Sequence, residues 1–134
     1  WAAGCILYEL IIGDMLFDPE KDKNKSRDYY HLLEMTKVSG RFQKKFLKST
    51  KYWRKFFERD GDLKDIEFRE YYDWDELLEK VKDDKERTLI IDLLKKMLQL
   101  YPKNRPSAED ILKHDWLLSK SDESSSDNSV AQSS

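Results

Sequence analysis

The 134 residues match the length of a single domain, and the charges nearly cancel, with 25 Lys and Arg against 27 Asp and Glu. This balance excludes a generally basic protein that binds nucleic acid or an anionic membrane through its net charge, and no apolar run is long enough to span a bilayer. With only 4 Gly and 3 Pro and with 13% aromatic residues, collagen-like and wholly disordered classes are excluded as well. The single cysteine excludes an internal disulfide, and no signal peptide is visible, so we expect a location in the cytoplasm or nucleus and no membrane partner.

The first twelve residues are apolar on every side of a helical wheel, and Glu9 is their only charge. A helix of this kind is typical of the buried centre of a larger protein. Gly13 is expected to end the helix, because glycine is favoured just past a helix C-terminus. Since the chain begins with Trp1 and not with Met, we expect a fragment whose N-terminal partner is missing.

The middle of the chain combines a helix with two blocks of opposite charge. Asp28 is a candidate N-cap for a helix that runs to Ser39 and stops at Gly40. Residues 41–59 hold eight basic side chains and one acid among many aromatics, which predicts short amphipathic helices, and residues 60–79 hold nine acids and two bases. Basic residues among aromatics can bind nucleic acid. The pattern favours instead a solvated helical face that the acidic block compensates, so no direct nucleic-acid binding is expected.

The clearest helix follows the sequence DDKE, which is similar to a capping box with Asp83 as the cap and Glu86 three residues later. Its apolar residues form one stripe, namely Ile90, Leu93, Leu94, Met97 and Leu98. Two prolines within residues 101–106 break it, and Ser107 can cap a short helix that ends near His114. No strand pattern is visible, so the predicted fold class is all-α, with a folded part over residues 1–118.

Residues 119–134 form a separate, acidic segment in which eight of sixteen residues are serine. Such a segment cannot bury enough apolar surface to offset the entropy of ordering it, so it is predicted to be disordered. A plain solubilising tail is the favoured interpretation. Phosphorylation of serines beside acids, as at Ser121, is the alternative.

The residues themselves indicate no catalytic, cofactor-binding or metal-binding site. The four glycines are far apart, so no loop can cradle a phosphate group. His31 and His114 lie 83 positions apart without other metal ligands at suitable spacing. Cys5 lies among small and apolar residues, which is typical of an inert thiol and not of a nucleophile.

Two segments nevertheless resemble protein kinases. Residues 1–17, WAAGCILYELIIGDMLF, are similar to the buried helix that follows the activation segment, and residues 100–116, LYPKNRPSAEDILKHDW, are similar to the end of the kinase domain. Both patterns occur in the family's order, about a hundred residues apart. The resemblance implies the helical C-terminal part of the protein kinase-like fold, which is incomplete in this chain.

The stretch between these segments resembles the SR protein kinases at residues 26–32, 51–57 and 61–66. These are Ser/Thr kinases of the CMGC group that phosphorylate serines in Arg/Ser-rich proteins, typically splicing factors. The resemblance implies ATP and Mg²⁺ as cofactors of the whole kinase, with this chain providing scaffold and substrate-docking surface and binding neither cofactor itself. Another CMGC kinase, or a non-catalytic helical remnant that acts as an interaction module, remains the alternative.

The resemblance also singles out a few side chains. In SR protein kinases an acidic groove holds the substrate's arginines; one of its acidic positions matches Asp14 and a basic one matches Lys80. Two further acidic positions align with Tyr30 and Lys37, so one carboxylate is lost and another is reversed in sign. Arg105 matches an arginine that forms a buried ion pair with a glutamate upstream of this chain.

Overall fold

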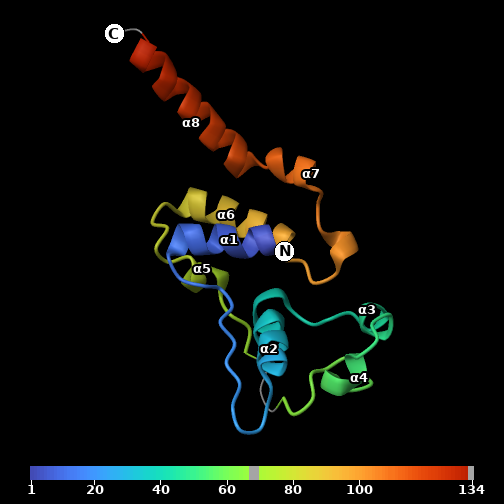
Figure 1. Ribbon diagram of the computed structural model, residues 1–134. Coiled ribbons are helices and arrows are strands. Elements are labelled where there is room, and N and C mark those ends of the chain that lie inside the picture. The colour runs from blue at the N-terminus through green and yellow to red at the C-terminus, as the bar shows by residue number, and fades with distance from the viewer. Residues whose placement is uncertain (67–69, 133–134) are drawn as a thin grey trace.

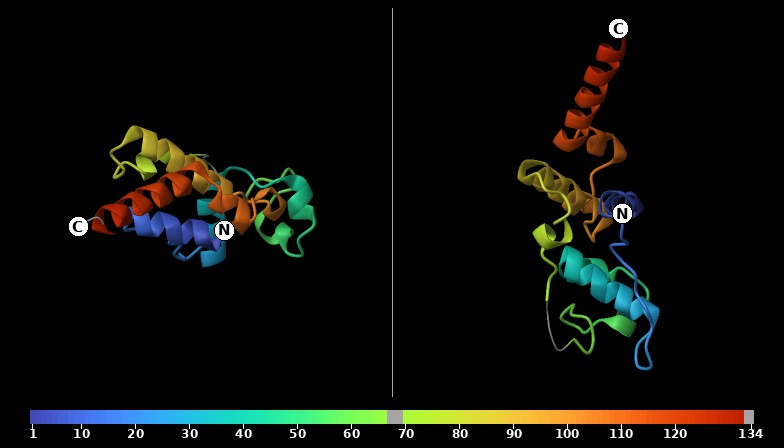
Figure 2. Two further views of the ribbon diagram at one scale, coloured as in Figure 1. Left: turned by 90° about the horizontal axis from the view of Figure 1, so that it is seen from above. Right: turned by 90° about the vertical axis from the view of Figure 1, so that its left-hand side faces the viewer.

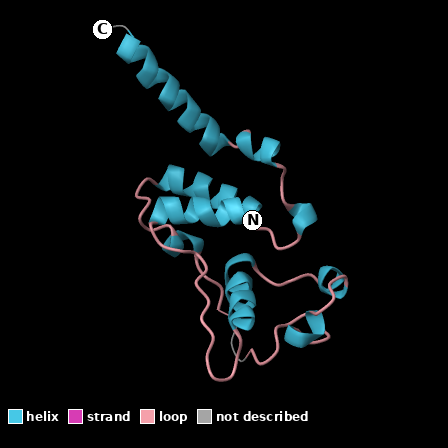
Figure 3. Ribbon diagram, in the orientation of Figure 1, coloured by secondary structure: helices cyan, strands magenta, loops and turns pink. Residues whose placement is uncertain are grey.

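Eight α-helices and the loops between them form nearly all of the structure, a computed structural model that describes residues 1–66 and 70–132 and, over 126–132, the backbone alone (Figures 1 and 3). The helices are α1 (Ala2–Ile12), α2 (Arg27–Ser39), α3 (Lys44–Lys48), α4 (Trp53–Phe56), α5 (Trp74–Leu77), α6 (Asp84–Met97), α7 (Ala108–Leu112) and α8 (Asp115–Gln132), with a 3-10 turn η1 at Pro102–Asn104. The described residues contain no strand, and an isolated bridge joins Phe57 and Leu63. The predicted all-α class is confirmed.

Local signals account for several of the helix ends. The Asp83 carboxylate accepts a hydrogen bond from the backbone N–H of Glu86, and the Ser107 hydroxyl accepts one from Asp110, as the sequence predicts. The prediction for α2 was wrong, because Ser26 and not Asp28 is its N-cap. The serine hydroxyl accepts a hydrogen bond from the N–H of Tyr29. Asp28 therefore lies in the first turn, where its negative charge interacts favourably with the positive end of the helix dipole.

Helices α1 and α6 lie side by side and antiparallel, and they form the centre of the main core (Figure 1). Gly4 makes this packing possible, because a Cβ atom there would lie 3.0 Å from Leu98 Cδ2 and 3.1 Å from Met97 Cβ. The predicted stripe of α6 is largely buried: Ile90, Leu93, Leu94 and Leu98 are at most 2% exposed. None of the described helices is long and apolar enough to cross a membrane.

A second core lies below α1 in Figure 1 and joins α2 to the segment that carries α3 and α4. Its buried members are Tyr29, Phe42, Leu47, Phe57, Leu63 and Leu100. The side chains of Trp1 and Met35 pack against both cores. The basic stretch is therefore fixed to the body of the protein through its aromatic residues, while its charged residues face outward.

Helix α8 differs from the sequence prediction, since it continues to Gln132 where a disordered tail is expected from residue 119. It projects away from the rest of the molecule (Figure 2). Its first half is tied to α6, because the Trp116 indole and the Lys120 ammonium both bond to the Glu86 carboxylate. Further along, serine hydroxyls donate to backbone carbonyls one turn earlier, as Ser124 does to Lys120.

Candidate functional site

The structure brings together two of the predicted docking residues, Asp14 and Lys80, at the C-terminal end of α1. Gly13 ends that helix in the left-handed conformation with φ of 88°. The Lys80 ammonium donates to the Ile12 carbonyl at 2.9 Å and lies 3.6 Å from the Asp14 carboxylate. Lys80 therefore donates a hydrogen bond to a carbonyl that the helix leaves unpaired, at the negative end of the helix dipole. It also partly neutralises Asp14, the acidic residue that matches the family's docking groove.

Lys37 contacts a different part of the molecule. Its ammonium lies over the Tyr72 ring, 5.6 Å from the ring centre, and its carbonyl accepts a hydrogen bond from the Tyr72 N–H at 2.9 Å. The side chain is half-buried on the last turn of α2. Tyr30, at the other altered position, donates its hydroxyl to the Asp22 carboxylate.

Arg105 fastens the N-terminus of the chain to the segment after α6. Its guanidinium lies 5.4 Å from the centre of the Trp1 ring and donates to the carbonyl of Gln99 at 2.7 Å. The Trp1 ring also stacks on Phe17, with centroids 5.5 Å apart. Within the described residues no carboxylate lies within ion-pair distance of Arg105, so its pairing with an upstream glutamate stays a prediction.

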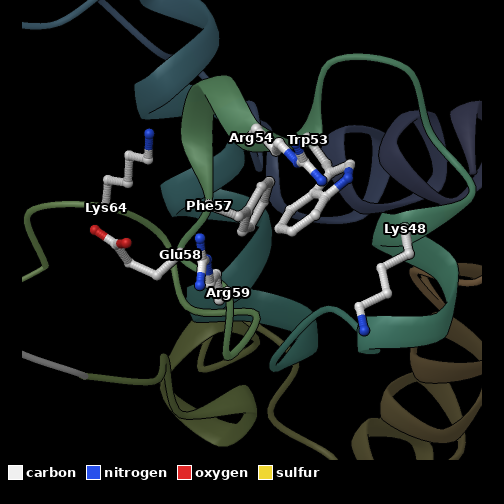
Figure 4. Close-up of a pocket in the computed structure, with 7 residues that line it drawn as sticks. All are labelled: Lys48, Trp53, Arg54, Phe57, Glu58, Arg59 and Lys64. Atoms are coloured by element: carbon white, nitrogen blue, oxygen red, sulfur yellow. The ribbon is translucent and has the colours of Figure 1, made fainter.

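The structure also reveals a basic pocket that the sequence interpretation missed (Figure 4). Its volume is about 460 Å³, and it is lined by four cations, one carboxylate and two aromatic rings: Lys48, Arg54, Arg59, Lys64, Glu58, Trp53 and Phe57. In Figure 4, Lys48 lies at one end of the pocket and Glu58 and Lys64 at the other, with the two rings between them. We call this the basic pocket.

The basic pocket is built by helices α3 and α4 and by the turn that follows α4. Phe57 and Leu63 bridge across this turn, the Glu58 N–H donates to the Asp62 carbonyl at 2.7 Å, and Gly61 has φ of 94° at its tip. The Tyr29 hydroxyl of α2 donates to the Lys64 carbonyl at 2.7 Å, which attaches the turn to the second core. The interleaving of basic and aromatic residues was the only sequence signal for this pocket.

The described residues present no cluster of potential metal ligands. Among them, no group of three or more His, Cys, Asp or Glu side chains is placed to hold a metal ion. His114 bonds to Asp92 at 2.7 Å, and the His31 ring packs against Phe17, so the two histidines have separate partners. Cys5 is half-buried, and burial raises the pKa of its thiol, which opposes formation of the nucleophilic thiolate.

Comparison with known families decides what this helical unit is. The protein kinase domain matches the chain over residues 1–117. The chain belongs to the protein kinase family. Arg105 and helix α1, which the sequence resemblance pointed to, therefore lie in the part of this kinase chain that matches the family.

Among curated proteins, this kinase chain is similar to SR protein kinases. It is 34% identical over 119 residues to the serine/threonine-protein kinase SKY1 of Saccharomyces cerevisiae, covering 87% of this chain and 16% of that protein. Human SRSF protein kinase 3 is 34% identical over 119 residues, covering 87% and 21%. The kinase spk-1 of Caenorhabditis elegans is 32% identical over 128 residues, covering 88% and 12%. The chain thus spans about a fifth or less of the length of these relatives.

Proposed function

We propose that this kinase chain is the scaffold and docking part of a serine/threonine protein kinase that transfers phosphate from ATP to serines of Arg/Ser-rich proteins such as splicing factors. The observation that carries the proposal is the similarity to SRSF protein kinase 3 and SKY1 over 119 residues, which is nearly the whole chain. We expect ATP and Mg²⁺ to be bound by other residues of the whole protein, in keeping with the resemblance to protein kinases.

The role of this part is to position other segments and the substrate. Helix α1 forms the rigid centre, packed against α6, and Arg105 clamps Trp1 at its start. At its far end, the exposed Asp14 carboxylate is the acidic group that an arginine of the substrate can approach. We place the contact with substrate arginines there.

Docking of arginine is expected to be weakened by the chain's own cations. Lys80, which lies 3.6 Å from Asp14, matches a basic position of the family's groove, so the difference from the relatives lies at the altered positions. There Tyr30 carries no carboxylate and Lys37 supplies a positive charge. A like charge at the rim of a binding surface repels the incoming cation. We expect this protein to bind Arg/Ser peptides about tenfold more weakly than its relatives do.

The experiment that tests the activity is phosphoryl transfer by the full-length protein. With Mg-ATP, it is expected to phosphorylate the serines of an Arg/Ser-repeat peptide and to act poorly on the matching Gly/Ser peptide. Absence of transfer to every serine peptide would favour the non-catalytic module, and equal transfer to both peptides would contradict arginine docking.

A second measurement tests the docking surface. The full-length protein and its Lys37→Glu variant are titrated with the Arg/Ser peptide at moderate salt, and the variant is expected to bind more tightly. Lys85→Glu, the same change at an exposed lysine in the first turn of α6, serves as the control for a general charge effect. Equal affinities of wild type and Lys37→Glu would remove Lys37 from the docking surface.

A further inference from the structure

The basic pocket carries positive charge that the rest of the chain leaves uncompensated. Some cations elsewhere pair with acids, as Arg41 does with Asp62 at 2.6 Å and Lys120 with Glu86 at 2.9 Å. By contrast, Lys48, Arg54 and Arg59 form no ion pair with a carboxylate in the described part of the chain. The prediction that the acidic block compensates the basic stretch thus holds for Arg41 but not for this pocket.

The arrangement of the aromatic rings favours a phosphate group over a nucleic-acid base. The Arg54 guanidinium lies 5.5 Å from the centre of the Trp53 ring, and Lys51 and Lys55 lie over neighbouring rings in the same way. Base recognition by stacking needs an open ring face. In the basic pocket the Arg54 guanidinium lies over the Trp53 ring, and Phe57 is only 5% exposed. A guanidinium stacked on a ring is held in place and can still donate its in-plane N–H groups to a phosphate.

Glu58 limits which anion can occupy the pocket. It lies at the end opposite Lys48 (Figure 4) and is the one carboxylate that lines the pocket. A continuous polyanion such as RNA would be repelled along this end. In Figure 4, Arg59 lies beside Glu58, and Lys48 lies across the two rings. A phosphate placed between Lys48, Arg54 and Arg59, with a cation beside it at Glu58, would satisfy both kinds of charge.

We propose that the basic pocket binds a phosphoserine peptide, with the phosphate held by Lys48, Arg54 and Arg59 and a basic residue beside the phosphoserine held by Glu58. The proposal rests on the proposed function, because a serine kinase acting on Arg/Ser proteins produces such peptides. The volume of about 460 Å³ accommodates a phosphorylated side chain together with its neighbour.

The pocket is preorganised for this role. Phe57 and Leu63, which flank its turn, are 5% and 4% exposed, and the Lys64 N–H donates to the Phe56 carbonyl at 2.8 Å. The backbone that carries Glu58 and Arg59 is therefore fixed before a ligand arrives. Binding then costs mainly the ordering of the lysine and arginine side chains.

The test is the binding of a fluorescently labelled peptide, with one phosphoserine between arginines, to the full-length protein without ATP. Its affinity is expected to exceed that of the same peptide with unmodified serine at least about tenfold, and the advantage should shrink as salt rises. Lys48→Gln and Arg59→Gln should each remove most of the advantage. Lys45→Gln, on the same helix but outside the pocket, should leave it intact.

Competition of the labelled peptide with inorganic phosphate and with a short RNA shows which class of phosphate ligand the pocket prefers. Inorganic phosphate should displace the peptide only at far higher concentration, since it lacks the basic neighbour, and Glu58→Gln should reduce this difference. Displacement by inorganic phosphate as effective as by the peptide itself would overturn the role of Glu58. Equal affinity for both peptides, or unchanged affinity in both pocket variants, would overturn the proposal, as would tighter binding of a short RNA through Lys48 and Arg59.

This assay involves no phosphoryl transfer, so its failure is distinct from failure of the proposed function. A protein that phosphorylates the Arg/Ser peptide but does not distinguish the phosphoserine peptide keeps the kinase function and loses the pocket. A protein that binds the phosphoserine peptide through Lys48 and Arg59 but transfers no phosphate keeps the pocket and loses the kinase function.

Discussion

At the scale of single residues, Gly4 sets how closely α1 and α6 approach. Because Leu98 and Met97 lie 3.0–3.1 Å from where its Cβ would be, Gly4→Val should force the helices apart and lower the free energy of unfolding by about 1–3 kcal/mol. Chemical denaturation of the full-length protein measures this loss. Ala3→Val, exposed on the same helix, should cost less than about 1 kcal/mol. Equal losses would mean that helix propensity and not packing is responsible.

Arg105 is a second single residue that stabilises the fold, through its contacts with the Trp1 ring and with backbone carbonyls. Arg105→Ala removes the contact with Trp1 and the N–H donors to the Gln99 and Leu100 carbonyls, so it should lower the free energy of unfolding by about 1–3 kcal/mol. Arg105→Lys should recover part of this, since it retains the charge but not the planar fork. Lys103→Ala, exposed on η1, is the control. A wild-type denaturation midpoint for Arg105→Ala would show that the clamp contributes nothing.

At the scale of elements, the attachment of α8 to α6 depends on the charge of Glu86. Lys120, and after it Trp116, lower the pKa of Glu86 by bonding to its carboxylate. A carboxyl with a lowered folded-state pKa stabilises the fold above its unfolded pKa and loses that contribution as pH falls through the folded value. Backbone N–H groups of residues 115–125 should therefore exchange with solvent faster at acidic pH, after correction for the intrinsic rate.

The variant Glu86→Gln separates the contribution of Glu86 from that of Asp92. The pKa of Asp92 is also lowered, by Lys96 and His114, so acid weakens a second contact between α6 and the start of α8, whereas the variant changes only the first. The amide of Glu86→Gln accepts from Trp116 but carries no charge, so α8 should exchange faster than wild type at neutral pH and respond less to acid. An identical exchange profile in wild type and variant would mean that the charge of Glu86 does not hold α8.

Local features of this fold could be predicted from the sequence, whereas contacts between distant residues could not. The helix α6 and its Asp83 cap could be predicted because their signals lie within a few residues of each other. The contact of Lys37 with Tyr72 and the bond from Tyr29 to the Lys64 carbonyl each join residues 35 positions apart. Such contacts depend on how the chain folds back on itself, so the basic pocket could not be derived from spacing, although its residue types were visible. The extension of α8 to Gln132 could not be predicted, because the sequence of residues 119–132 has no apolar periodicity, which is the main signal for a helix.

At the scale of the whole molecule, α1 is apolar on all sides but only one side is covered. Tyr8 and Ile12 are buried toward α6, while Ile6 and Leu10 are 57% and 78% exposed. Each Å² of apolar surface removed from water stabilises an association by about 25 cal/mol, so this side should draw copies of the 134-residue chain together. Light scattering after size-exclusion chromatography is expected to show oligomers that grow with concentration.

Lysines on the exposed side of α1 test whether that side causes the self-association. Ile6→Lys with Leu10→Lys should raise the monomer fraction without lowering the melting temperature, because neither side chain is buried within the chain. Leu112→Lys removes a leucine that is 67% exposed on α7 and serves as the matched control. If Leu112→Lys dissolves the oligomers as well, general surface hydrophobicity and not α1 drives the association, and a wild-type chain that stays monomeric at every concentration contradicts the prediction outright.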